Sequence, residues 1–167
     1  LDQFKIFLES TFKQIKDMGI KDLIIDIRKN GGGDSRLTNE FMQYISKTDF
    51  RTSDTCIVRI SKELMGLESL SWIDSSKRII GTNFSMRDTS MIKLSANPLR
   101  FKGNVFLLIG GSTYSSASMF ASVFQCYQVG KISGSETGGQ TACYGDAACH
   151  ITLPETGLDL KVSAKKF

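Results

Sequence analysis

The fold is decided first by the stretch VFLLIGGSTYSSASMFA at residues 105–121. Five apolar residues predict a buried strand, and two glycines then lead into a helical pattern. Ser115 stands at this junction, beside the backbone N–H groups of a first helical turn, which have no partner within the helix. Ser115 is therefore a candidate nucleophile. The competing interpretation is that Thr113 or Ser115 only caps the helix, because Ser and Thr are common N-cap residues.

A second strand–glycine–helix unit lies upstream, in the stretch DLIIDIRKNGGGD at residues 22–34. The carboxyl ends of parallel strands lie at one edge of a sheet, so we expect the two glycine turns at the same edge. A backbone N–H from Gly31, Gly32 or Gly33 would then lie near the Ser116 N–H. Two such donors beside Ser115 would form an oxyanion hole, which favours acyl transfer by stabilising the developing negative charge.

These two stretches, together with GSETGG at residues 134–139, resemble the core of the S41 serine peptidases. That family contains the C-terminal processing (tail-specific) peptidases and the tricorn-like core peptidases. The resemblance covers roughly residues 20–165 and implies a ClpP/crotonase-like α/β fold, with a mostly parallel sheet flanked by helices. It implies that Ser115 is the nucleophile, that the Ser116 N–H is one oxyanion donor, and that Gly32, or else Gly31 or Gly33, supplies the second.

The chain departs from the family pattern at two positions. The family's glutamate is Ser118 here, and the lysine that processing peptidases use as general base is Gln140, whose amide cannot take the serine proton. Tricorn-like members take their base from a histidine that precedes the first strand, so the resemblance implies a base before residue 1 and a chain that is a fragment. His150 is the second candidate, although a lone strand histidine is more often structural. Glu136 is a candidate for orienting a base or contacting substrate, or it is a solvated turn carboxylate. Gln140 stands at the position of the base and is a further candidate for contacting substrate.

The function that these residues predict is hydrolysis of peptide bonds through an acyl-enzyme on Ser115. A catalytically inactive peptide- or ligand-binding module on the same scaffold would account for Gln140 and Ser118, because fold alone does not determine function. A different acyl-transfer enzyme that uses the same oxyanion pocket is a third possibility. The resemblance also implies export to the periplasm or cell envelope, where bacterial members of the family commonly work.

Composition narrows the classes of partner. The 167 residues suit one protease-core domain over residues 1–167, with residues 61–102 as an insertion that contains short helices. The net charge is +4, the basic residues are scattered and there is one tryptophan, so nucleic acid is not an expected partner. No apolar run approaches the roughly 20 residues that span a bilayer. We expect a polypeptide substrate and no cofactor, and the sequence leaves the oligomeric state open.

The cysteines leave alternatives open. Cys143 and Cys149 flank a turn-like loop and could form a disulfide in an exported protein. With His150 they offer three candidate zinc ligands, but no further close pair completes a site of four donors, so no metal is predicted. Cys126 falls on the helix after Ser115, and we expect it to be a buried small hydrophobe.

The remaining patterns place the other elements. Phe4, Leu8, Phe12, Ile15 and Met18 recur at helical spacing, and Gly19 predicts the end of that helix. A strand is expected at residues 55–60, and a hairpin that closes the chain is expected at residues 151–162. Because strands alternate with helices, the sheet is expected to be mostly parallel.

Overall fold

The computed structural model describes residues 1–65, 70–140, 142 and 144–167. The contacts divide the chain into two compact units. The first contains Leu1–Thr52 and Ser90–Thr141, and the second contains Ser53–Thr89 and Ala142–Phe167.

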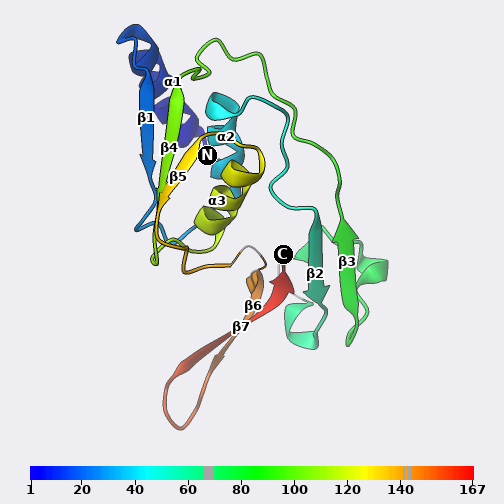
Figure 1. The fold of residues 1–167 in the computed structure, drawn as a ribbon. Coiled ribbons are helices and arrows are strands. Elements are labelled where there is room, and N and C mark those ends of the chain that lie inside the picture. Colours follow the sequence, from blue (N-terminus) through cyan, green and yellow to red (C-terminus); the bar gives the residue numbers. More distant parts are fainter. Residues whose placement is uncertain (66–69, 141, 143) are drawn as a thin grey trace. The chain divides into compact units, whose positions relative to one another are not determined.

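The first unit holds a three-stranded parallel sheet in the order β1-β4-β5, with three helices (Figure 1). Its elements are α1 (Asp2–Asp17), β1 (Asp22–Asp26), α2 (Ser35–Ile45), β4 (Asn104–Ile109), α3 (Ser116–Cys126) and β5 (Lys131–Gly134). Ile24 pairs with Phe106, and Leu107 pairs with Ile132, across the two parallel ladders. Both predicted strand–turn–helix units therefore leave the same edge of one sheet.

The first helix ends where its glycine predicts. Leu8 and Phe12 on its apolar face are buried. Gly19 follows the helix with φ +64°, a left-handed conformation that glycine adopts without steric cost. The Ile20 N–H then donates to the Ile15 carbonyl over 3.1 Å, which closes the helix end.

Aromatic contacts join the three helices of this unit in one core. The rings of Phe12 and Tyr44 lie 4.7 Å apart between centroids, and those of Phe41 and Phe120 lie 5.7 Å apart in an edge-to-face arrangement. Such pairs add about 0.5–1.5 kcal/mol beyond the area they bury. Phe41 belongs to α2 and Phe120 to α3, so this contact fixes the two helices that begin at the turns after β1 and β4.

The second unit is a four-stranded antiparallel sheet in the order β3-β2-β7-β6. Its elements are β2 (Thr55–Arg59), the short 3-10 helices η1 (Lys62–Leu64) and η3 (Ser75–Lys77), β3 (Asn83–Arg87), β6 (Tyr144–Thr152) and β7 (Asp159–Lys166). The predicted closing hairpin is confirmed, since β6 and β7 pair up to Thr152 and Asp159 and the chain turns between them.

The predicted strand at residues 55–60 is present, but it pairs antiparallel with β3 and β7 and does not join the parallel sheet. Its buried residues alternate as Cys56, Val58 and Ile60, while its other side chains are more exposed. A strand with one buried face is typical of antiparallel sheets, whereas parallel strands are usually covered on both faces. The α/β class is confirmed, with a parallel and an antiparallel sheet.

One side-chain prediction is wrong. Cys126 is exposed at the last position of α3. It follows the buried Phe124 by two residues, and two positions along a helix place a side chain on nearly the opposite face.

Cys143 and the side chain of Cys149 lie outside the described part of the structure, so their disulfide stays a prediction. Within the described residues, no helix combines the length and the apolarity that crossing a bilayer requires.

Candidate active site

Ser115 occupies the strained junction between β4 and α3. It is the residue before the first helical turn, and its φ of +53° and ψ of −128° are unusual for any residue but glycine. A non-glycine residue held in such a conformation costs about 1–3 kcal/mol. Its side chain forms no capping hydrogen bond. Ser115 is exposed, and its hydroxyl has no partner among the described residues.

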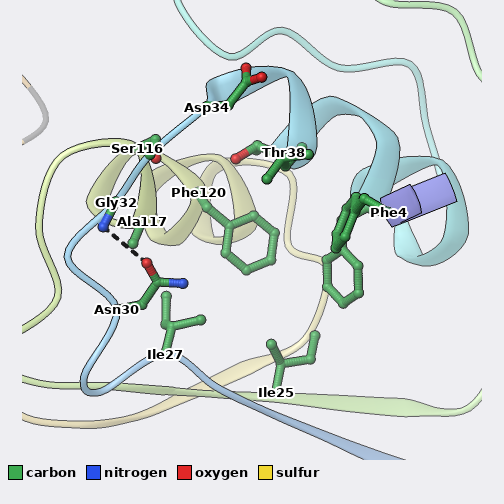
Figure 2. A pocket seen from close by; sticks show the side chains of 13 residues that line it. Phe4, Ile25, Ile27, Asn30, Gly32, Asp34, Thr38, Ser116, Ala117 and Phe120 are labelled. Atoms are coloured by element: carbon green, nitrogen blue, oxygen red, sulfur yellow. Dashed lines mark hydrogen bonds between the residues drawn. The ribbon is translucent and has the colours of Figure 1, made fainter. Parts of the chain in front are cut away.

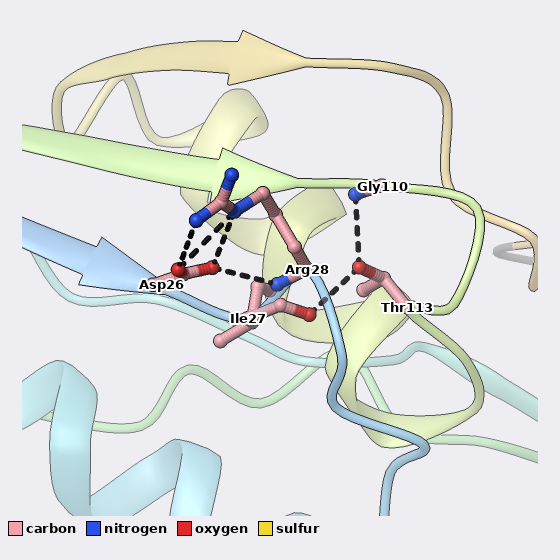
Figure 3. Close-up of polar contacts among 5 residues, drawn as sticks. All are labelled: Asp26, Ile27, Arg28, Gly110 and Thr113. Carbon is pink, nitrogen blue, oxygen red and sulfur yellow. Dashed lines mark hydrogen bonds and ion pairs between the residues drawn. The ribbon is translucent and has the colours of Figure 1, made fainter.

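Buried hydrogen bonds hold this turn against the end of β1 (Figure 3). The Thr113 hydroxyl donates to the Ile27 carbonyl over 2.8 Å and accepts from the Gly110 N–H over 3.1 Å. The Tyr114 N–H donates to the Asn30 carbonyl over 3.0 Å. The segment that carries Ser115 is therefore tied directly to the segment that carries the glycines.

Gly32 lies against Ser115. A methyl group built on the Gly32 Cα would lie 2.6 Å from the Ser115 Cβ and 3.0 Å from the Ser116 nitrogen. Gly32 also has φ +97°, in the left-handed region that favours glycine. Both the space and the backbone conformation therefore require glycine here. The structure brings Ser115, Ser116 and Gly32 together at the carboxyl edge of the parallel sheet.

The amides around Ser115 differ in what they contact. The Ser116 N–H belongs to the first turn of α3 and has no hydrogen-bond partner among the described residues, nor do those of Gly31 and Gly33. The Gly32 N–H instead donates to the Asn30 Oδ1 over 2.9 Å (Figure 2). Sequence reasoning missed this contact, although Asn followed by glycines is a signal for such an Asx turn. Which glycine supplies an oxyanion donor stays a prediction.

The loop after β5 packs its backbone on the same turn. The Gly139 N–H donates to the Thr113 carbonyl over 3.0 Å. A methyl group on Gly139 would lie 3.0 Å from the Ser115 nitrogen, so this glycine also permits a close approach. Glu136 and Gln140 are exposed on this loop. Their roles toward Ser115 stay predictions.

A pocket of about 240 Å³ opens beside these groups, between α2, α3 and β1 (Figure 2). Gly32 and Ser116 lie on its wall, together with Asp34 and Thr38 from the start of α2. The apolar side chains that line it include Phe4, Ile25, Ile27, Leu37, Phe41 and Phe120. Small-molecule sites usually measure roughly 300–1,000 Å³, so this volume suits one apolar side chain better than a whole ligand.

The carboxylates at this edge are paired with arginines. Asp34 accepts hydrogen bonds from the guanidinium and the backbone N–H of Arg36, and these lower its pKa from 3.8 to about 2. The side chain and backbone N–H of Arg28 likewise lower the pKa of Asp26 to about 2. Both carboxylates are ionised at neutral pH, and a carboxylate with so low a pKa is a poor general base.

His150 lies in the second unit. It is an exposed residue of β6, opposite Lys161 in the antiparallel ladder. The structure thus places the candidate nucleophile and the only histidine of the sequence on different units. The role of His150 as a base stays a prediction.

Comparison with known families identifies the class of the chain. The profile of peptidase family S41 matches residues 2–148, and the chain therefore belongs to this family. The predicted resemblance is confirmed. No curated protein matches the sequence at a significant level.

Solved structures share the fold at low sequence identity. The photosystem II D1 C-terminal processing protease matches with a TM-score of 0.59 and 16% identity, over 99% of this chain and 34% of its own. A candidate peptidase from Parabacteroides merdae ATCC 43184 gives a TM-score of 0.61 and 21% identity, over 96% of this chain and 43% of its own. Mature CPAF gives a TM-score of 0.58 and 16% identity, over 94% of this chain and 38% of its own. The chain thus spans less than half the length of each of these proteins.

Proposed function

We propose that this chain carries the nucleophile of a serine endopeptidase. The observation that supports this most strongly is the conformation of Ser115, an exposed serine at φ +53° whose hydroxyl is unpartnered among the described residues. A strained strand-to-helix turn that presents a serine hydroxyl is typical of nucleophile elbows. Membership of peptidase family S41 supports the same conclusion.

In the proposed reaction, the Ser115 Oγ attacks the carbonyl carbon of a peptide bond while a general base takes its proton. The resulting oxyanion accepts hydrogen bonds from the Ser116 N–H and from one N–H of the Gly31–Gly33 turn. The base then passes its proton to the amine, which leaves. Water hydrolyses the remaining ester and restores the serine. Removing one oxyanion donor in such sites costs on the order of 100- to 1,000-fold in rate.

The general base is a separate part of this proposal. The amide of Gln140 cannot accept the proton, so we propose a histidine, either one that precedes residue 1 or His150. A serine hydroxyl without such a partner is a weak nucleophile at neutral pH. Substituting His150 by glutamine separates the two candidates, because only a base role for His150 predicts a large loss of activity.

The pocket supports a preference for apolar residues next to the cleaved bond. It adjoins Ser116 and the Gly31–Gly33 turn, whose N–H groups would bind the carbonyl oxygen of that bond, and Phe41 and Phe120 are part of its lining. We expect cleavage of a mixed peptide library mainly after apolar residues, mapped by mass spectrometry. Cleavage after acidic or basic residues at equal rates would contradict this assignment of the pocket.

Fluorophosphonate labelling of the whole protein tests the proposed nucleophile. We expect one covalent adduct, located on Ser115 by peptide mapping, that is absent in Ser115→Ala. Labelling of Ser112 or another serine in place of Ser115 would show that Ser115 is not the nucleophile. A denatured sample serves as control, because only a folded site activates the hydroxyl.

A binding module is the second candidate, and one contact favours it. The Gly32 N–H already donates to the Asn30 Oδ1, so this amide is engaged within the chain. A module of this kind would bind peptides without labelling of Ser115 and without turnover. Calorimetric titration of the Ser115→Ala variant and of the wild-type protein with the same peptide measures that binding directly.

We also propose that the protein works in the periplasm or cell envelope. This rests on the family resemblance. Fractionation of the producing cells, followed by detection with an antibody, tests it.

A further inference from the structure

We infer that Thr113 is a positioning residue that holds Ser115 in its reactive conformation. The inference rests on the proposed function of Ser115 and adds a residue for which that proposal gives no role. Thr113 is fully buried, two residues before the nucleophile. It acts through hydrogen bonds to four other residues of the first unit and does not itself contact substrate.

The side chain of Thr113 joins the ends of two strands. Its hydroxyl donates to the Ile27 carbonyl over 2.8 Å, one residue beyond β1, and accepts from the Gly110 N–H over 3.1 Å, one residue beyond β4 (Figure 3). Each of those backbone groups leads into one of the two site turns. The hydroxyl therefore sets the distance between the glycine turn and the Ser115 turn.

The carbonyl of Thr113 joins two further segments. It accepts from the Ser118 hydroxyl over 2.9 Å, in the first turn of α3, and from the Gly139 N–H over 3.0 Å, in the loop after β5. Ser118 is 2% exposed, so its hydroxyl is committed to this contact. The residue that replaces the family's glutamate thus fastens the helix to the turn that carries Ser115.

This arrangement accounts for how a strained residue is retained. A non-glycine residue at positive φ persists only where the surrounding structure fixes the backbone on both sides. Thr113 fixes the chain before Ser115, and the Ser118 hydroxyl fixes the chain after it through the same residue. Valine at position 113 would keep the shape and remove both hydrogen bonds of the side chain. The buried Gly110 N–H would then be left without its partner, and the Ile27 carbonyl would keep only the hydrogen bond from the Asn30 N–H.

The experiment compares Thr113→Val with Thr113→Ser, which keeps the hydroxyl. Thr82→Val is the matched control, because it removes a threonine–carbonyl hydrogen bond of the same 2.8 Å length in the second unit. Fluorophosphonate labelling of Ser115 is followed in the whole protein as a function of reagent concentration. Circular dichroism confirms folding of each variant.

We expect Thr113→Val to lower the maximal labelling rate about tenfold or more, because small displacements of a reacting group have effects of that size. The half-saturating reagent concentration should stay within about threefold, and Thr113→Ser and Thr82→Val should label within about threefold of wild type. Wild-type labelling by Thr113→Val, or labelling by Thr113→Ser as slow as by Thr113→Val, would overturn the inference.

Amide hydrogen exchange separates this inference from the proposed function. If the wild-type protein is not labelled, the proposed nucleophile fails, and Thr113 is then tested by exchange in residues 110–116 and at Gly139. Faster exchange there in Thr113→Val alone supports the positioning role, and unchanged exchange overturns it. If Thr113→Val does not fold, Ser118→Ala removes one contact to the Thr113 carbonyl, and the same two outcomes apply to it.

Discussion

The two helices that begin at the carboxyl edge of the parallel sheet start in opposite ways. Asp34 precedes α2 with φ −71°, and its carboxylate accepts from the Arg36 N–H over 2.9 Å. Ser115 precedes α3 with φ +53°, and its side chain caps nothing. One helix start is stabilised by its own residues, whereas the other is strained and leaves a hydroxyl and an N–H without a partner among the described residues.

This difference agrees with the proposed role of Ser115 as a nucleophile. Serine is among the preferred N-cap residues, so a relaxed backbone would have let Ser115 cap α3 as Asp34 caps α2. At φ +53° and ψ −128°, however, the Ser115 side chain forms no capping hydrogen bond to α3. The groups left without partners are those that an acyl-transfer transition state requires.

The largest expected effect comes from closing the space beside Ser115. Gly32→Ala would force a methyl group against the Ser115 Cβ and the Tyr114 carbonyl and hold alanine at φ +97°. We expect a loss of about 2–3 kcal/mol in the free energy of unfolding, measured in urea, together with loss of Ser115 labelling.

Gly31→Ala is the control, because a methyl group there meets nothing within 4 Å. We expect the control to change the free energy of unfolding by less than about 1 kcal/mol. Equal losses in both variants would show that Gly32 is not held against Ser115.

A smaller effect of opposite sign is expected at Ser115 itself. Glycine adopts φ +53° without the steric cost that alanine or serine bears. Ser115→Gly should therefore unfold with a free energy about 1 kcal/mol higher than Ser115→Ala, while both variants lose labelling. Urea denaturation of the two variants measures this difference. A more stable alanine variant would mean that the turn before α3 is not strained.

The smallest effect is expected from acid at the start of α2. The pKa of Asp34 is lowered to about 2, so its contribution to stability is present above its ordinary pKa of 3.8 and is lost as the pH falls from there toward 2. Asp34→Asn keeps a capping acceptor but cannot titrate. The thermal midpoints of the variant and the wild type should differ most near neutral pH and converge as the pH falls through about 2. A difference that stays constant across this range would contradict the role of the Asp34–Arg36 pair.

Much of the first unit could be predicted from sequence because its signals are local. Apolar runs of strand length, glycines at the ends of strands and the helical spacing before Gly19 each depend on neighbouring residues. The pairing of β2 could not be predicted in the same way, since its partners lie in β3 and β7 and its own pattern fits more than one sheet.

The candidate site, too, could be predicted from the sequence only in part. The residue types of Ser115 and the Gly31–Gly33 turn are visible in the sequence, and so is their common edge of the sheet. The positive φ at Ser115 could not be predicted from the sequence, because a Thr-Tyr-Ser sequence also fits an ordinary helix cap. The contact between the Gly32 N–H and the Asn30 Oδ1 depends on one side-chain rotamer and became visible only in the structure.

The pairing of β1 with β4 also sets when the site can exist. Asp22 and Asn104 face each other across 82 residues of chain, so the ladder forms only after a long loop has closed. Contacts of this separation are slow to form during folding. A growing chain on the ribosome therefore lacks the proposed catalytic centre until the segment that contains Ser115 has emerged and docked on β1.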